Sequence, residues 1–75
     1  MKTEDSLLPR RYEILQVIKE HRSVSFDFII RRFTAINERT LRYDLKKLCD
    51  HGFIHKRGIT KGVAYEAVKH QPHKP

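Results

Sequence analysis

The chain has 75 residues and a formal net charge of +7 at pH 7. A chain of this length forms one small domain with a compact core. Its positive charge favours an anionic partner. Charge alone does not distinguish nucleic acid from an acidic membrane surface or from a role in solubility.

Two features of the sequence predict where the protein acts. No apolar run approaches the roughly 20 residues that span a bilayer, and residues 1–13 lack the apolar centre of a secretory signal. The single cysteine, Cys49, excludes an intramolecular disulfide, in keeping with a reducing compartment. We therefore expect a cytoplasmic, intracellular protein, associated with the nucleoid if its source is bacterial or archaeal.

The first predicted element is a helix that begins at Pro9, since proline is tolerated in a first helical turn. Residues 1–8 before it are polar and poorly patterned, and they predict a flexible N-terminus. Ile14, Leu15 and Ile18 form the expected buried stripe of the helix. The following Ser23–Ser25 is too short to predict more than a bridge strand.

A second helix is predicted from its cap, Ser25, to about Phe33. Its inward side would comprise Phe26, Ile29, Ile30 and Phe33. Only a few residues then separate it from the next helix, so the pair predicts a helix-turn-helix arrangement.

The third predicted helix, residues 37–51, is the most informative part of the chain. Asn37 is a favourable N-cap residue, and Gly52 can adopt the left-handed conformation that ends a helix. Leu41, Leu45 and Leu48 recur on one side with the helical period. The remaining surface is cationic and rich in hydrogen-bond donors, a composition suited to the major groove of DNA. It comprises Arg39, Thr40, Arg42, Tyr43, Lys46 and Lys47.

Beyond Gly52 the sequence predicts a two-stranded β-hairpin whose loop is bounded by Gly58 and Gly62. Its expected inward face comprises Ile54, Tyr65, and Ala67 or Val63. Lys56, Arg57 and Lys61 would place positive charge near the tip of the hairpin. The tail, residues 69–75, has two prolines and almost no apolar residue, which predicts disorder.

The string NERTLRYDLKKLCDHGFIHKRG, which starts at Asn37, resembles the helix-turn-helix motif of DeoR-type bacterial regulators and of winged-helix modules in some Fic-domain proteins. Asn37 stands at the capping serine, Thr40 at the threonine, and Asp44 with Leu45 at the aspartate-leucine pair. Tyr43 replaces the usual arginine, so a ring or a hydroxyl would take the place of that cation. The resemblance extends from about Arg11 to Val68, and the effector and catalytic domains of those families have no counterpart in these 75 residues.

The resemblance implies an α+β winged helix-turn-helix, residues 9–68, with three helices followed by a two-stranded β-hairpin wing. The expected function is sequence-specific binding of double-stranded DNA by a transcription regulator. In such proteins, the position of Arg39 often carries a base-contacting side chain. The expected DNA-binding residues are Asn37, Arg39, Thr40, Arg42, Tyr43, Lys46, Lys47, Lys56, Arg57 and Lys61.

Chemistry divides this set into two roles. Arg39 would reach a guanine edge or a nearby phosphate, while Thr40 and Tyr43 would contact backbone oxygens or a thymine methyl group. The hairpin cations would mainly neutralise phosphates and make the affinity dependent on salt.

Other readings remain open at this point. The same fold is also used as a protein-interaction module, in which the charge would serve solubility or an acidic partner, and RNA or a non-B helix are alternative ligands. A homodimer would add affinity, with Leu7, Leu8 and the outer side of the first helix as candidate contacts.

Several charged residues have alternative structural readings. Arg10, Arg11, Arg31 and Arg32 could contact the DNA backbone, act as solubilising charges, or pair locally with Asp27 or Glu13. Asp44 at the margin of the core needs a donor, and we expect it to anchor a neighbouring helix or an arginine.

The sequence predicts neither a metal site nor an enzyme. Cys49, His51 and His55 have ligand chemistry, but a fourth ligand is not evident and Gly52 interrupts the helix between them. His70 and His73 lie in the polar tail. No nucleophile has an adjacent base and an oxyanion-binding loop, so no cofactor is expected.

Overall fold

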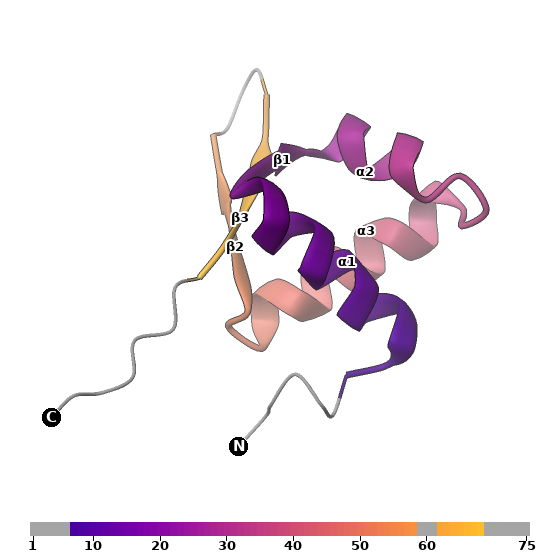
Figure 1. Cartoon of the computed structure of the whole chain (residues 1–75), viewed down its shortest axis with the longest axis horizontal. Helices are drawn as coiled ribbons and strands as arrows, with labels where there is room; N and C mark the ends of the chain where they lie inside the picture. Colours follow the sequence, from indigo (N-terminus) through magenta and orange to yellow (C-terminus); the bar gives the residue numbers. More distant parts are fainter. Residues whose placement is uncertain (1–6, 59–61, 69–75) are drawn as a thin grey trace, which may run out of the picture.

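The computed structural model describes residues 7–58 and 62–68, which form three helices and a three-stranded antiparallel sheet (Figure 1). The predicted α+β class is confirmed. The predictions for residues 1–6, Lys61 and the tail 69–75 lie outside the described residues. The elements in chain order are α1 (Pro9–His21), β1 (Ser23–Ser25), α2 (Phe26–Arg32), α3 (Glu38–Asp50), β2 (Ile54–Arg57) and β3 (Ala64–Ala67).

The sheet corrects the prediction of a two-stranded hairpin. Its strand order is β1-β3-β2, with Val24 of β1 opposite Tyr65 of β3. Ser23–Ser25 is thus a full strand and more than a bridge. Val24 is buried between two exposed serines, and pairing with β1 satisfies backbone groups that a two-stranded hairpin would leave on an open edge of β3.

The first turns of α2 and α3 have the capping chemistry that the sequence predicts. Ser25 Oγ accepts a hydrogen bond from the Phe28 amide at 3.1 Å, and Asn37 Oδ1 accepts one from the Thr40 amide at 2.9 Å. Each bond satisfies a first-turn N–H that has no partner inside its helix. The two helices are therefore separated by residues 33–37 only.

The end of α3 is fixed by the backbone of Gly52, whose φ is +83°. The Gly52 amide donates to the Cys49 carbonyl and the Phe53 amide donates to the Leu48 carbonyl, both at 3.0 Å. This is the Schellman arrangement, which satisfies the last free carbonyls of a helix. It turns the chain directly into β2, so α3 and β2 become neighbours.

The core lies between the three helices and one face of the sheet. The stripe residues of α1 and α3 are buried as predicted, and in α2 Ile29 and Phe33 are buried while Phe26 and Ile30 are partly buried. Ile54 and Tyr65 close the core from the sheet, with Val63 and Ala67 partly buried beside them. The buried apolar residues are Ile14, Leu15, Val17, Ile18, Val24, Ile29, Phe33, Leu41, Leu45, Leu48, Ile54 and Tyr65.

Within the part of the chain that the structure describes, no helix combines the length and the apolar character that crossing a membrane requires.

Candidate nucleic-acid interface

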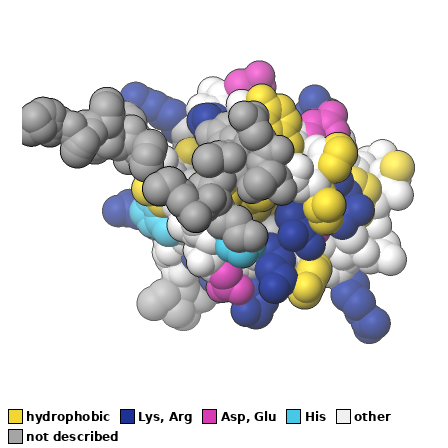
Figure 2. All heavy atoms as spheres, turned by 90° about the horizontal axis from the view of Figure 1, so that it is seen from below, with side chains coloured by type: hydrophobic (Ala, Val, Ile, Leu, Met, Phe, Trp, Pro, Cys, Tyr) yellow, Lys and Arg dark blue, Asp and Glu magenta, His cyan; other side chains and the backbone are white. Residues whose placement is uncertain are grey.

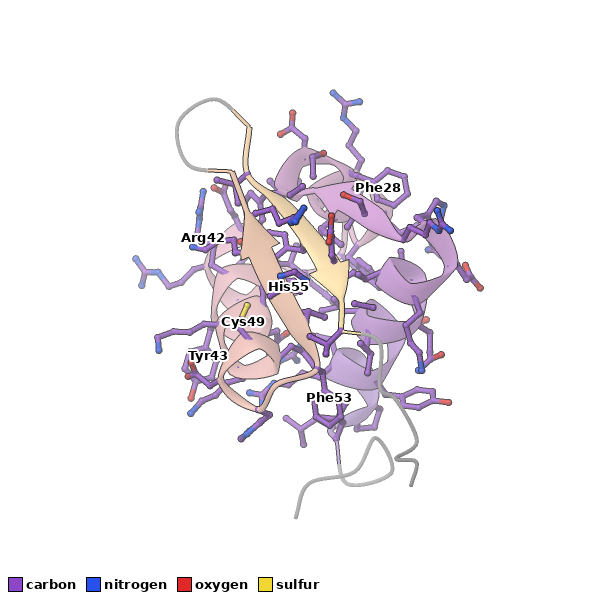
Figure 3. The ribbon with its side chains drawn as sticks, turned by 90° about the vertical axis from the view of Figure 1, so that its left-hand side faces the viewer. Phe28, Arg42, Tyr43, Cys49, Phe53 and His55 are labelled. Atoms are coloured by element: carbon purple, nitrogen blue, oxygen red, sulfur yellow. The ribbon has the colours of Figure 1, made fainter. Side chains whose placement is uncertain are left out.

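The outward side of α3 is open to solvent. Arg39, Arg42, Tyr43 and Lys46 are exposed, while the leucines of the same helix are buried. Figure 3 shows Arg42 and Tyr43 extending from the same edge of α3. The position of these side chains follows from the helical period, since residues opposite a buried stripe must face the solvent.

Two cations of this surface have acidic neighbours one helical turn away. Arg42 Nη2 lies 2.9 Å from Glu38 Oε2, and Lys46 Nζ lies 3.2 Å from Asp50 Oδ2. All four side chains are at least half exposed, and such pairs contribute little because solvent and salt screen them. Arg39 forms no ion pair within the described residues. The cations can therefore exchange their present partners for phosphates at small cost.

Aromatic rings orient the cations at both flanks of α3. The Arg42 guanidinium lies 4.2 Å from the centroid of the Phe26 ring of α2. On the other flank, Arg11 of α1 and Lys47 each lie 5.4 Å from the centroid of the Tyr43 ring. Tyr43 thus carries no charge itself but holds two cations beside it.

The first turn of α3 contributes less free hydrogen-bonding capacity than the sequence suggests. The Asn37 side-chain oxygen is engaged by the Thr40 amide, which leaves the Asn37 amide nitrogen as its free donor. Thr40 itself is half-buried. These two predicted site residues therefore lie at the beginning of the exposed surface and act partly as structural groups.

The predicted hairpin cations separate onto the two faces of the sheet, because successive strand residues point in opposite directions. Lys56 is directly opposite Tyr65 and faces the helices. Arg57 lies on the outer face, where Arg57 Nε and His55 Nε2 are each 3.5 Å from Glu66 Oε1. Of the two hairpin cations that the structure describes, Lys56 is therefore the one that lies with the cations of α3.

Lys56 and α3 enclose an open groove of about 420 Å³. We call it the α3–β2 groove, and its lining residues are Arg42, Lys46, Cys49, Asp50, Lys56 and Tyr65. Figure 3 shows Cys49 between α3 and β2. Seen from below, several Lys and Arg side chains lie together near the lower centre of the view, beside hydrophobic and acidic ones, and others are spread around the outline (Figure 2).

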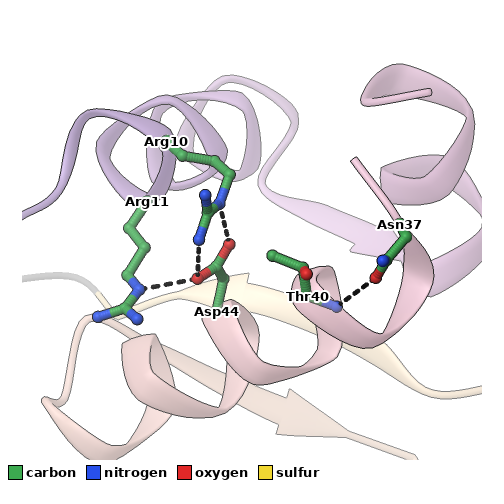
Figure 4. Close-up of polar contacts among 5 residues, drawn as sticks. All are labelled: Arg10, Arg11, Asn37, Thr40 and Asp44. Atoms are coloured by element: carbon green, nitrogen blue, oxygen red, sulfur yellow. Dashed lines mark hydrogen bonds and ion pairs between the residues drawn. The ribbon is translucent and has the colours of Figure 1, made fainter. Parts of the chain in front are cut away.

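Asp44 fixes α3 from behind and is completely buried. It accepts two hydrogen bonds from Arg10, from Nε and, at 3.1 Å, from Nη2, and a third from Arg11 Nε at 2.9 Å (Figure 4). Burial raises the pKa of Asp44, but the hydrogen bonds from Arg10 and Arg11 outweigh it and hold the pKa below its ordinary value of 3.8. The carboxylate is thus ionised and links α3 to the first turn of α1.

This cluster corrects one reading of the sequence and confirms another. Arg10 and Arg11 pair with Asp44, not with Asp27 or Glu13. The expected structural role of Asp44 as an anchor is confirmed. The sequence shows an acidic residue beside a leucine stripe, and such a buried carboxylate requires a hydrogen-bond donor. The sequence does not identify the donors, because they lie 33 and 34 residues away along the chain.

Cys49, His51 and His55 do not form a metal-ligand set. In residues 7–58 and 62–68, no three His, Cys, Asp or Glu side chains are grouped so that they could hold a metal ion. Burial raises the pKa of the Cys49 thiol above its ordinary value, and Lys56 and Lys46 oppose that shift only in part. Cys49 therefore lines the groove as a neutral thiol at pH 7.

Comparisons with protein-family models, with curated proteins and with solved structures gave no match to this chain.

Proposed function

We propose that the chain is a winged helix-turn-helix protein that binds double-stranded DNA in a sequence-specific manner and regulates transcription. In this proposal α3 enters the major groove, and the β2–β3 hairpin lies against the adjacent backbone. Arg39 reads a base edge, and Lys46, Lys47 and Lys56 neutralise phosphates.

One observation carries the proposal: a rigidly supported helix exposes its cations next to a cation from the sheet. Leu41, Leu45 and Leu48 pack α3 into the core, and Asp44 ties it to α1. The opposite side presents Arg39 and its neighbours to solvent. A helix that is fixed in this way can present donors to a groove without losing much conformational freedom on binding.

The test begins with the selection of preferred duplexes from a random pool by the full chain. Binding of the selected duplex and of an unrelated duplex is then compared by fluorescence anisotropy for the wild type, Arg39→Ala and Lys47→Ala. Arg39→Ala should reduce the preference for the selected duplex about tenfold, because a bidentate base contact is worth about 1–3 kcal/mol. Lys47→Ala should weaken both duplexes equally.

Arg22→Gly provides the matched control. It removes one positive charge at the end of α1, next to β1, which is at the opposite edge of the sheet from β2. Its φ of +67° suits glycine, so the backbone is not strained. Equal losses in Arg22→Gly and Arg39→Ala would mean that only the net charge matters.

Two other results would replace the proposal. A folded wild-type chain without DNA affinity at low salt would favour a protein-interaction module. Stronger binding of an RNA duplex than of any selected DNA duplex would assign the same surface to RNA.

A further inference from the structure

The α3–β2 groove contains residues that α3 would not need in order to contact the major groove of DNA. Its lining comes from three elements, α3, β2 and β3, and contains three cations and one carboxylate, a formal balance of +2. Its volume of about 420 Å³ is in the range of pockets that hold small molecules.

Tyr65 is the residue that marks the groove as a site. Its side chain is 93% buried, since only 7% of the residue is exposed. The Tyr65 hydroxyl has no hydrogen-bond partner among the described residues. No fully enclosed side-chain oxygen or nitrogen in that part of the chain lacks a partner, so solvent reaches this hydroxyl, and Tyr65 lines the groove. The phenol donor is therefore available to a ligand in the groove.

The groups around Tyr65 are also donors. Burial raises the pKa of Tyr65, the neighbouring Cys49 adds to the shift, and Arg42 opposes it. Tyr65 and Cys49 are therefore both protonated at pH 7, and each can donate. Lys56 lies directly opposite Tyr65 in the strand register, so an ammonium group borders the same space.

We propose that the α3–β2 groove binds one phosphate group, with the Tyr65 hydroxyl and the Lys56 ammonium as its principal donors. Arg42 supplies further positive charge from α3, while Lys46 offsets the nearby Asp50. The Asp50 carboxylate opposes an anion, but its charge is engaged by Lys46 at 3.2 Å. A group with several oxygens and a negative charge matches this arrangement of donors.

The phosphate can be carried by the DNA backbone or by a free phosphate ester. The first source rests on the proposed function, because a backbone that leaves the major groove beside α3 would pass over β2. The second source does not depend on DNA binding.

The experiment titrates the full-length chain with inorganic phosphate and with methyl phosphate, with sodium chloride at matched ionic strength as reference. Backbone amide shifts of Cys49 and Lys56 are followed by NMR. Saturable shifts with both phosphates, beyond those with chloride, are expected. Tyr65→Phe should weaken phosphate binding about tenfold, since it removes one hydrogen bond to a charged group. Lys56→Gln should weaken it at least about fivefold.

Two control variants match these changes. Arg57→Gln removes a cation from the adjacent position on the other face of β2, and Tyr12→Phe removes the hydroxyl of an exposed tyrosine. Both should bind phosphate like the wild type. Lys56 is exposed, so Lys56→Gln remains informative if Tyr65→Phe fails to fold.

The affinity of Tyr65→Phe for the selected DNA duplex identifies the source of the phosphate. A loss of duplex affinity parallel to the loss of phosphate affinity assigns the groove to the backbone, and an unchanged duplex affinity assigns it to a free ester. Phosphate binding without any DNA binding would reject the proposed function and keep the site. Phosphate shifts no larger than those with chloride, or variants that bind like Arg57→Gln, would overturn the site even where Arg39→Ala behaves as predicted.

Discussion

Asp44 is a buried charge whose compensation comes entirely from another helix. Replacing it with asparagine (Asp44→Asn) removes the negative charge and exchanges one of the two oxygens that accept from Arg10 and Arg11 for an NH2 group, which weakens the link between α3 and α1. Loss of one partner from a buried ion pair costs about 3–5 kcal/mol. Arg10 is 38% exposed and can regain water, so we expect a loss of about 2–3 kcal/mol in the free energy of unfolding, measured by urea denaturation.

Asp50→Asn is the matched control, because it makes the same change on the same helix in an exposed pair. It should change the free energy of unfolding by less than about 1 kcal/mol. Similar losses of unfolding free energy in the two variants would show that burial does not make the Asp44 pair more stabilising than an exposed pair.

The cluster of Asp44 with Arg10 and Arg11 should make the stability of the fold decrease in acid. The pKa of Asp44 is lower in the folded chain than its ordinary value of 3.8, so the unfolded chain binds the proton more readily. The contribution of Asp44 is therefore complete above the unfolded pKa and is lost as the pH falls from there through the folded pKa. Between pH 7 and pH 3, the wild type should lose more stability than Asp44→Asn, and parallel curves would contradict the assignment.

Among the elements, α3 has a first turn that is closed by the side chain of its N-cap residue. Asn37→Ala removes the side-chain acceptor of the Thr40 amide. It should lower the free energy of unfolding by about 1 kcal/mol and increase hydrogen exchange at Thr40. Asn37→Ser retains an acceptor, and its stability should remain close to that of the wild type. An Asn37→Ala variant with unchanged exchange would show that packing alone holds this end of the helix.

Local sequence chemistry predicted the helices well because each helix depends on neighbours in the chain. The cap at Asn37, the leucine period and the stop at Gly52 all lie within one segment, and the structure has each of them. Strand β1 was predicted as no more than a bridge strand, for the opposite reason. Ser23–Ser25 has only one apolar residue, and it becomes a strand through Tyr65, which lies far along the chain.

The candidate site shows the same division between local and distant information. Periodicity placed Arg39 and Lys46 on the open side of α3. It did not show which of the neighbours Lys56 and Arg57 faces the helices, since that depends on the pairing of β2 with β3. Nor did it reveal the α3–β2 groove, which requires Tyr65 and Cys49 to meet across two elements.

At the scale of the whole molecule, the distribution of charge predicts the response of DNA binding to salt. The surface formed by α3 and β2 carries Arg39, Arg42, Lys46, Lys47 and Lys56. If these five cations replace counterions on the duplex, the logarithm of the association constant should fall with the logarithm of salt concentration with a slope of about −4.5, since each neutralised phosphate contributes about −0.9. A slope near zero for the selected duplex, measured by anisotropy over a salt series, would contradict a footprint of this kind.

The link between α1 and α3 has a practical consequence for anyone who shortens this chain. Arg10 and Arg11 belong to the first helical turn, so a truncation that starts at Tyr12 would spare every fully buried apolar residue and still strip the carboxylate at position 44 of its arginine donors. Expression tags are therefore best joined ahead of residue 9, with a spacer that leaves both guanidinium groups free to reach inward.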